Sequence, residues 1–436
     1  MLSTRHSVIL LGPILVLVIL LNACSDDPVA PEPPAPPVEQ LVISELPRDM
    51  SPEVPPEDLD QLSAGNREFT VKFFKETTAE QNLIFSPLSL RQGMVLQYAG
   101  ARGQTAVEMD HALCYGLDQS ALHPAMNARN LILAGRYNPG EGHWPSLDLI
   151  MANSLWSPRG FEFVPDYLDL LAVNYGAGVH TVDFENAPEQ CRGLINDWVA
   201  EETGDRILEL LPSGSIDGRT STVLVNTLNF EAAWVSPFKP EDTTEDPFTL
   251  LDGTTTTVSM LKSSIGDFRY YEDDECQAAR LYFYEESWSL AMVLILPGPG
   301  QFQTFVDELD TAKLDQILSG FSYDGVFLAL PKFTFDFECP LNETMQSLGM
   351  HLAFDDEAAD FSGMTNEDIR IDQSYHRTSI SVDEIGVAMA AATVEIDAPV
   401  GLPQNSFVAD RPFLFLIRDW RTDTILFFGQ VVDPSL

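Results

Sequence analysis

The chain has 436 residues, of which 45% are hydrophobic and 21% are charged, so it contains enough apolar sequence for a large core. It carries 24 Lys and Arg residues against 66 Asp and Glu residues, which gives a formal net charge of −42 at pH 7. This negative field repels nucleic acid and anionic membrane surfaces and excludes them as electrostatic partners, while it favours solubility or the attraction of a basic partner protein.

The N-terminus predicts an exported protein. Arg5 precedes an apolar run, Val8–Leu21, which is too short to span a bilayer comfortably and is typical of a signal-peptide core. The following Asn22-Ala23-Cys24 completes a stretch that resembles a bacterial lipobox, in which Cys24 would carry the lipid. We therefore expect residues 1–23 to be a lipoprotein signal peptide. An ordinary signal peptide that contains a cysteine is the alternative.

Residues 24–58 predict a tether. Prolines recur between Pro28 and Pro56 and are interleaved with acidic residues, so the segment cannot bury enough apolar surface to fold. We expect it to be disordered and extended, at about 3 Å per residue where it is polyproline-like. With lipid on Cys24 it would attach an exported domain to a bacterial membrane. Ser25 favours the outer membrane or cell surface, by similarity to Gram-negative lipoproteins.

Four cysteines remain after Cys24. An oxidising compartment would allow two disulfides among them, with three possible connectivities. Their spacing is wide and irregular and there is no CxxC pair, so neither a zinc site nor a redox motif is indicated. A core of this size does not need covalent bridges. We therefore expect free, buried thiols at Cys114, Cys191, Cys276 and Cys339.

Helical patterns dominate the first part of the predicted domain. From Leu59 onward, apolar residues recur at helical spacing, and a second helical stretch follows Asn82–Leu90 and reaches Tyr98. Gly100–Thr105 predicts a turn with Thr105 as a helix cap, and further helical patterns run to about Leu133. Two later segments also predict helices, Asn186–Leu211 and Phe302–Leu318.

Strand patterns dominate the middle and the end of the chain, where β-branched and aromatic residues are enriched. Phe413–Ile417 and Thr424–Val431 predict a buried hairpin. Because strands and helices mix without a strict βαβ order, the fold class is α+β. The other predicted strands are Leu147–Trp156, Ser221–Trp234, Ala278–Tyr284, Leu290–Leu296 and Val326–Phe337.

No catalytic constellation is recognisable in the sequence. There is no GxSxG elbow, HExxH pair, P-loop or GxGxxG loop, and the seven histidines are scattered, with no pair at a helical metal-ligand spacing. Nothing places a nucleophile beside a base. The sequence therefore predicts a protein that is not an enzyme and that holds no metal and no cofactor.

The most informative segment lies near the C-terminus. Asp383-Glu384-x-Gly386 precedes a run of small residues to Thr393, and Asp410–Phe415 follows a stretch that contains prolines. This arrangement resembles the reactive loop of serpins. Other segments resemble serpin segments in the expected order: Asn82–Leu90, Gly100–Thr105, Val225–Trp234, Met260–Lys262, Pro331–Phe333, Leu348–Met350, Asp360–Gly363 and Phe428–Pro434.

The resemblance covers nearly all of residues 59–436 and implies one serpin-like domain. It would contain three β-sheets with surrounding helices and an exposed reactive loop at about 384–408, and it would be a monomer. In serpins a target protease attacks the loop and forms an acyl-enzyme. The cleaved loop then inserts into the main sheet as an extra strand and distorts the protease before deacylation.

The small residues after Glu384 permit such an insertion. No proline interrupts Gly386–Ala398, and alternate side chains would occupy opposite faces of a new strand. An Ala-rich helix at Val387–Thr393 is the alternative that propensity alone favours. The hinge implied by the resemblance comprises Glu384, Gly386, Val387, Ala388, Met389, Ala390, Ala391, Ala392 and Thr393.

Three hinge positions depart from the usual serpin pattern. Ala388 stands where serpins usually carry Glu, Ile385 where they carry Lys or Arg, and Met389 where they carry Ala. Met389 would face inward, where overpacking would slow insertion. Slow insertion turns an inhibitor into a substrate, so a non-inhibitory serpin that acts as a protease substrate or binding module is the alternative function.

Counting from Glu384 by the usual serpin loop length places the reactive bond at Val400–Gly401, with Gly401–Leu402 as the second choice. Asp397–Val400 resembles an elastase recognition sequence, because a small β-branched residue follows proline. The expected partners are elastase-like serine proteases. Chymotrypsin-like proteases, suggested by Leu402, and cysteine proteases are further candidates.

The resemblance also implies structural roles for several polar residues. Ser86, Ser89, Asn226 and His376 match the region where the main sheet of serpins parts, and they are expected to form a hydrogen-bonded latch. Trp234 matches the tryptophan near the top of that opening, with plain core packing as the alternative. Residues 112–134, where some serpins bind glycosaminoglycans, contain one basic residue, Arg129, so no glycosaminoglycan partner is expected.

Overall fold

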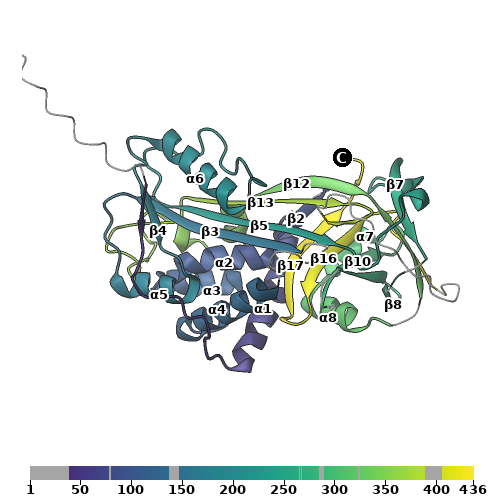
Figure 1. The fold of residues 1–436 in the computed structure, drawn as a ribbon, viewed down its shortest axis with the longest axis horizontal. Coiled ribbons are helices and arrows are strands. Elements are labelled where there is room, and N and C mark those ends of the chain that lie inside the picture. The colour runs from purple at the N-terminus through teal and green to yellow at the C-terminus, as the bar shows by residue number, and fades with distance from the viewer. Residues whose placement is uncertain are drawn as a thin grey trace, which may run out of the picture. The chain divides into compact units, whose positions relative to one another are not determined.

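The computed structural model describes residues 39–77, 80–136, 147–264, 266, 268–283, 289–322, 325–387 and 405–436. Within these residues the strands form three sheets, of seven, six and four strands, and helices surround them (Figure 1). The predicted α+β class is therefore confirmed. No helix among the described residues is long and apolar enough to cross a membrane.

The seven-stranded sheet has the order β1-β4-β3-β5-β14-β13-β12. Its central strand β5 pairs antiparallel with β3 along its length. Figure 1 shows β3, β5 and β13 crossing the middle of the view as long strands. The strands are β1 (Glu39–Val42), β4 (Val179–Val182), β3 (Asp148–Pro158), β5 (Val223–Ala233), β14 (Gly386–Val387), β13 (Gln373–Val382) and β12 (Phe333–Pro340).

The six-stranded sheet forms much of the core. Every residue of β10, β16 and β17 is buried, as expected for near-continuous apolar runs covered on both faces. β16 and β17 pair antiparallel, which confirms the predicted hairpin. This sheet comprises β2 (Leu83–Phe85), β17 (Thr424–Val431), β16 (Phe413–Asp419), β10 (Leu290–Pro297), β9 (Cys276–Tyr282) and β8 (Arg269–Glu272).

The four-stranded sheet contains the strand that follows the predicted reactive loop. That strand, β15 (Asn405–Val408), pairs in parallel with β11 (Val326–Pro331). β11 in turn pairs antiparallel with β7 (Thr255–Ser263), and β6 (Thr244–Thr249) lies at the edge. The two ends of the predicted loop therefore belong to different sheets.

Helices lie on both faces of the seven-stranded sheet. Figure 1 shows α6 on one side and α2 on the other. All of α2 is buried, and it begins at a Ser86 cap whose side chain accepts a hydrogen bond from Ser89 N–H, with Pro87 at its first position. The helices are α1 (Pro56–Thr77), α2 (Pro87–Tyr98), α3 (Gly103–Leu113), α4 (Gln119–Arg136), α5 (Pro165–Tyr175), α6 (Pro188–Glu202), α7 (Phe302–Glu308), α8 (Thr311–Ser319) and α9 (Leu341–Ser347).

Two predicted elements are divided in the structure. The predicted helix Phe302–Leu318 is two helices, because the Asp310 carboxylate accepts a hydrogen bond from Lys313 N–H and starts a new helix there. The predicted strand Val326–Phe337 is also two strands, β11 and β12, which separate at Lys332 and enter different sheets. In both cases the hydrophobic pattern continues across a break in the backbone.

Two other helix boundaries also differ from the prediction. The helix predicted for Asn186–Leu211 ends at Glu202, where Gly204 and Asp205 adopt positive φ angles of 59° and 62° that end helical geometry. Thr105 is not a cap, since α3 begins at Gly103. The Thr105 hydroxyl instead accepts a hydrogen bond from Asp360 N–H at 3.0 Å.

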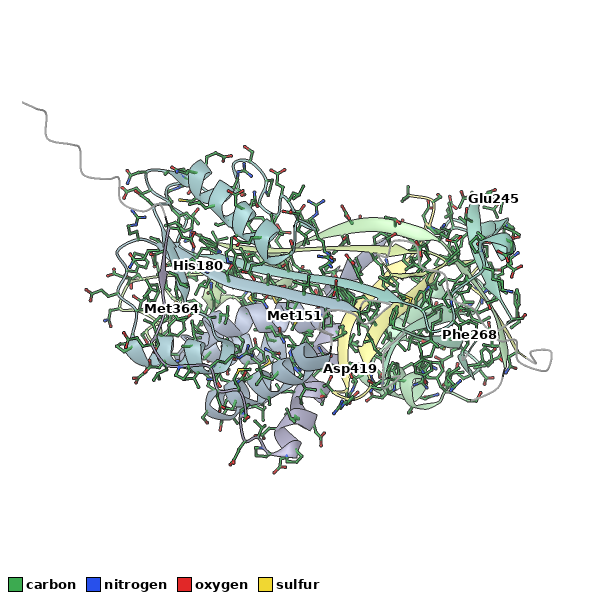
Figure 2. The ribbon with its side chains drawn as sticks, viewed as in Figure 1. Met151, His180, Glu245, Phe268, Met364 and Asp419 are labelled. Carbon is green, nitrogen blue, oxygen red and sulfur yellow. The ribbon has the colours of Figure 1, made fainter. Side chains whose placement is uncertain are left out.

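The prediction of a disordered tether is wrong for residues 39–58, which form a strand, backbone hydrogen bonds to the domain and the start of a helix. β1 pairs antiparallel with β4, and the His180 side chain (labelled in Figure 2) binds Glu39 at 2.7 Å. Further along, Asp49 N–H donates to Val173 O at 2.8 Å, and α1 begins at Pro56. Residues 38–46 contain no proline, so their backbone can satisfy the edge of β4. The predicted signal peptide and lipidated Cys24 lie outside the described residues.

The cysteines support the expectation of free thiols. Cys114, Cys191 and Cys276 are buried and unbridged. Burial raises the pKa of the Cys191 thiol to about 11, so this residue is protonated at neutral pH. The Cys339 side chain lies outside the described part of the chain. No group of His, Cys, Asp and Glu within the described residues could hold a metal ion.

Candidate functional site

The candidate site is the position between β5 and β13 in the seven-stranded sheet. At one end the two strands pair directly and in parallel, from Gln373↔Val223 to His376↔Asn226. At the other end β14 lies between them and pairs antiparallel with both. Between these ends, residues 227–231 of β5 pair only with β3, and residues 377–381 of β13 pair only with β12, as far as the described residues show. This space between the two strands is called the slot below.

A tight turn directs the chain into the slot. The Asp383 carboxylate accepts hydrogen bonds from Ile385 N–H at 2.8 Å and Gly386 N–H at 3.1 Å, and Asp383 N–H donates to Gly386 O at 3.1 Å. Gly386 then passes so close to β5 that a Cβ atom there would lie 2.0 Å from Ala232 O. Only glycine permits this approach, so Gly386 sets the entry of the chain into the sheet.

Trp234 holds the same turn from the end of β5. Its indole Nε1–H donates to Asp383 O at 3.1 Å, and its backbone N–H donates to Ile385 O at 2.8 Å. Trp234 is 2% exposed, and its ring stacks on Phe283 with the ring centroids 4.7 Å apart. Trp234 therefore packs in the core and also contacts the hinge, so both sequence interpretations of this residue apply.

Glu384 is held by three groups of the surrounding structure. Its carboxylate binds Lys332 Nζ at 2.8 Å and accepts a hydrogen bond from the Thr243 hydroxyl at 3.0 Å, while its carbonyl accepts one from Phe238 N–H at 2.8 Å. Burial by itself would raise the pKa of Glu384, but the hydrogen bonds from Lys332 and Thr243 outweigh it and lower the pKa. The carboxylate is therefore ionised and fixes the start of the hinge.

The four predicted latch residues meet at the closed end of the slot and are all buried. The Ser89 hydroxyl donates to Asn226 Oδ1 at 2.7 Å, and Ser86 N–H donates to His376 Nε2 at 3.1 Å. The second ring nitrogen, Nδ1, lies 3.1 Å from Asn226 Oδ1. The structure therefore brings together all four residues that the sequence identified.

The hydrogen bonds fix the protonation of His376. Because Nε2 accepts from a backbone N–H, the proton of a neutral ring must be on Nδ1, from which it donates to Asn226. Burial lowers the pKa of His376 to about 3, against a smaller opposing effect of Asn226. His376 is therefore neutral at physiological pH, and protonation of Nε2 would replace an acceptor by a donor facing Ser86 N–H.

The latch extends to residues that sequence reasoning missed. Asn226 Nδ2 donates to Asn153 Oδ1 on β3 at 2.7 Å and also contacts Ser89 O. The Thr378 hydroxyl donates to Ile84 O at 2.6 Å, next to the latch. A Cβ on Gly93 would lie 2.3 Å from Asn226 Nδ2, so α2 lies directly against β5 here. No short motif identifies these residues, because each contact joins distant segments.

The segment after α6 lies over the slot and contacts strands on both sides. Arg206 binds Glu231 of β5 at 2.6 Å and Asp148 of β3 at 3.3 Å. Arg377 of β13 donates to Glu209 O at 3.2 Å. A strand that entered the slot would pass beneath this segment, so these partly exposed contacts would have to rearrange.

Several predicted site residues lie outside the described residues. These are the hinge positions Ala388 to Thr393, the reactive bond at Val400–Gly401 and its second choice at Leu402. Among the predicted hinge residues, the structure places Glu384, Gly386 and Val387. Val387 is buried in β14, opposite Ala232 of β5.

Comparisons with known proteins agree on one family. The family model described as "Serpin (serine protease inhibitor)" matches residues 64–434. An uncharacterised serpin-like protein of Thermococcus kodakarensis is 32% identical over 445 residues, which cover 99% of each chain. The leukocyte elastase inhibitor of Bos taurus is 33% identical over 390 residues, and its human counterpart 32% over 389. Each match covers 86% of this chain and all of the relative.

Solved structures show the same similarity. The native state of tengpin, a thermophilic serpin, superposes with a TM-score of 0.77 at 25% identity, covering 90% of this chain and 100% of tengpin. Uncleaved ovalbumin gives a TM-score of 0.76 at 25% identity, covering 86% of this chain and 100% of ovalbumin.

Proposed function

The chain belongs to the serpin family, and we propose that it inhibits serine proteases by inserting its own cleaved loop into the seven-stranded sheet. The observation that supports this proposal is the position of β14. The first residues of the hinge already lie between β5 and β13 and pair with both strands, while the rest of the slot leads toward the latch.

Extension of β14 would satisfy backbone groups on both sides of the slot. Residues 227–231 and 377–381 already pair on their outer edges, so a new strand would use their inner edges. If about ten backbone hydrogen bonds form at roughly 1 kcal/mol net each, insertion is favourable by on the order of 10 kcal/mol before the cost of ordering the loop.

The latch opposes this extension in the intact protein. A strand that entered the whole slot would separate β5 from β13 and break the direct pair of Asn226 and His376. The buried hydrogen bonds of that pair therefore stabilise the uninserted state and not the inserted one. Cleavage of the loop would free the hinge to compete with them.

We propose Val400–Gly401 as the bond that the protease cleaves and elastase-like serine proteases as the targets. Support comes from the Pro399-Val400 sequence and from the relatives that are named leukocyte elastase inhibitors. On this proposal the chain is not an enzyme, because the catalytic groups belong to the protease. It acts on its target outside the cell, attached by lipid on Cys24 to a bacterial membrane, with the outer membrane or cell surface favoured.

An inhibition experiment tests the mechanism. We expect a mixture with a pancreatic-type elastase to give an SDS-resistant adduct and a released C-terminal peptide that begins at Gly401. An elastase whose nucleophilic serine is replaced by alanine should give neither product. Cleavage at Val400–Gly401 without an adduct would contradict inhibition and support the non-inhibitory alternative, which Ala388 and Met389 favour.

A matched hinge variant sharpens the same experiment. Met389→Ala removes the large side chain that would face inward in an inserted strand, so we expect it to raise the ratio of adduct to cleaved product. Thr393→Ala, which shortens a smaller side chain on the same face of that strand, is the control and should change the ratio less. A ratio that Met389→Ala leaves unchanged would show that overpacking does not limit insertion.

A further inference from the structure

A cavity of about 270 Å³ lies between α1, α4 and the connection from β16 to β17. Apolar side chains line one part of it, from Pro56 and Leu59 on α1 and Ile132 on α4. Arg129 on α4 and Thr422 in the connection line it as well. The cavity is formed by elements outside the slot. A ligand there would consequently need both an apolar and a hydrogen-bonding part.

Arg129 is the unusual residue of this cavity. It is 2% exposed, and its Nη2 group contacts the Met126 sulfur at 2.9 Å, which is a weak acceptor. Its Nε and Nη1 groups have no hydrogen-bond partner in the described part of the chain. Burial, and to a smaller extent Arg91, lower the pKa of Arg129 to about 9. A buried guanidinium without acceptors is costly, and an anion would relieve that cost.

Arg91 is a second buried arginine of this fold, and its contacts are those expected of a purely structural residue. It is as buried as Arg129, but its guanidinium donates to three backbone carbonyls at 2.9–3.0 Å: Leu113 O, Leu62 O and Cys114 O. Its charge is therefore fully solvated by the protein. Arg129 lies in the same region and lacks such acceptors, so burial alone does not explain it.

The connection between β16 and β17 supplies further groups. The Thr422 Oγ1 atom is buried and has no partner within the described residues, so it can donate to an anion. Arg421 is exposed and also lines the cavity. The carboxylate of Asp423 also lines the cavity, and its contacts with Arg67 and Arg418 neutralise it.

We propose that this cavity binds a small monocarboxylate that carries a short apolar group. The carboxylate would accept hydrogen bonds from Arg129 and Thr422, and the apolar group would contact Leu59 and Ile132. Asp60, an exposed acidic residue at the cavity, disfavours a dianion such as phosphate. A polyanion is disfavoured because Arg129 is the sole basic residue of 112–134 and the carboxylates of Asp60 and Asp423 also line the cavity.

Calorimetric titration of the intact protein with sodium butyrate tests the proposal. We expect saturable binding of butyrate, weaker binding of acetate because its apolar group is shorter, and none for phosphate at matched ionic strength. Binding should also raise the apparent melting temperature in proportion to ligand occupancy. Heat and melting changes that equal those of sodium chloride would overturn the proposal.

Variants locate the site. Arg129→Met keeps the side-chain length and removes the donors, so butyrate affinity should fall by about tenfold or more, and Thr422→Val should lower it by a smaller factor. Arg219→Met, at a highly exposed arginine, should leave affinity unchanged. Unchanged affinity in Thr422→Val and Arg129→Met would overturn the site. If Arg129→Met fails to fold, Thr422→Val and Ile132→Ala decide the question, because both must weaken butyrate binding.

Discussion

The two ends of the slot differ in how they are held. At the latch end, Asn226 and His376 are buried, pair directly across β5 and β13, and are connected to α2 and β3 by hydrogen bonds. At the hinge end, β14 separates the same two strands, and a partly exposed ion pair between Glu384 and Lys332 holds its entry. If the loop inserts as proposed, the buried latch would resist extension of β14 more than the partly exposed contacts at the hinge would.

The difference follows from solvation. Breaking a buried hydrogen bond leaves donors and acceptors that water cannot reach, whereas an exposed ion pair exchanges its partner for water at little cost. Substitutions at the latch should therefore lower the unfolding free energy more than substitutions at the hinge.

The largest effect is expected for His376→Ala. The substitution leaves Ser86 N–H without an acceptor, removes one donor to Asn226 and opens a cavity, so the intact protein should lose about 3 kcal/mol of unfolding free energy. Urea unfolding of intact and loop-cleaved protein measures it. His351→Ala, at an exposed histidine, is the control and should change little. An equal loss in both forms would show that the latch does not favour the uninserted state.

Acid should weaken the latch in the wild-type protein. The folded pKa of His376, about 3, lies below its unfolded value of about 6.5, so the unfolded chain binds the proton more tightly. The unfolding free energy that neutral His376 contributes is therefore complete above pH 6.5 and is lost as pH falls toward 3. At pH 5 about 2 kcal/mol of it is lost. His123, with a pKa of about 4 caused mainly by burial, adds an effect of the same sign.

The contribution of His376 to this pH dependence is obtained by comparing the wild-type protein with a variant that lacks the histidine. Unfolding free energies of wild type and His376→Gln are measured from pH 7.5 to pH 4.5, and the gap between them should narrow by about 2 kcal/mol at pH 5. The His123 effect is common to both proteins and cancels. A constant gap over this range would mean that His376 does not resist protonation in the folded protein.

A smaller effect is expected for Gly386→Ala at the hinge. The new Cβ would lie 2.0 Å from Ala232 O, so β14 must leave its position beside β5, at roughly 1–2 kcal/mol. Hydrogen exchange at Trp234 N–H, which donates to Ile385 O, should become faster. Gly193→Ala has open space around its Cβ and lies in α6, so it should not destabilise the protein. Unchanged exchange at Trp234 would contradict the close approach.

The smallest effect is expected for Glu384→Gln, which keeps an acceptor for Thr243 and removes the charge facing Lys332. The cost should be below about 1 kcal/mol at low salt and should vanish at about 1 M salt, because Lys332 is partly exposed. Asp336→Asn, which removes the exposed partner of Arg377, is the matched control. A loss larger than that of His376→Ala would reverse the order of the two ends.

Sequence patterns predicted an element correctly where the residues that determine it lie close together in the chain. The apolar run Phe413–Ile417 and its partner Thr424–Val431 predict their own burial and pairing. Helical periodicity predicts α1 from Leu59 onward, although the helix begins at Pro56. The four latch residues were identified through family resemblance and meet as expected. The single strand predicted across Lys332 was wrong, because the apolar alternation continues there while the chain passes from one sheet to another.

The sequence alone was therefore sufficient to predict the fold class and most of the elements, and its resemblance to serpins indicated which polar residues to look for at the latch. Three features became visible only in the folded molecule: residues from Glu39 form an edge strand, Gly386 and Val387 lie between β5 and β13, and Arg129 Nε and Nη1 are buried with no acceptor among the described residues. These features escape sequence patterns because strand pairing and desolvation depend on partners far along the chain. Composition and periodicity report which segments are apolar, but not which backbone or charged group each one meets.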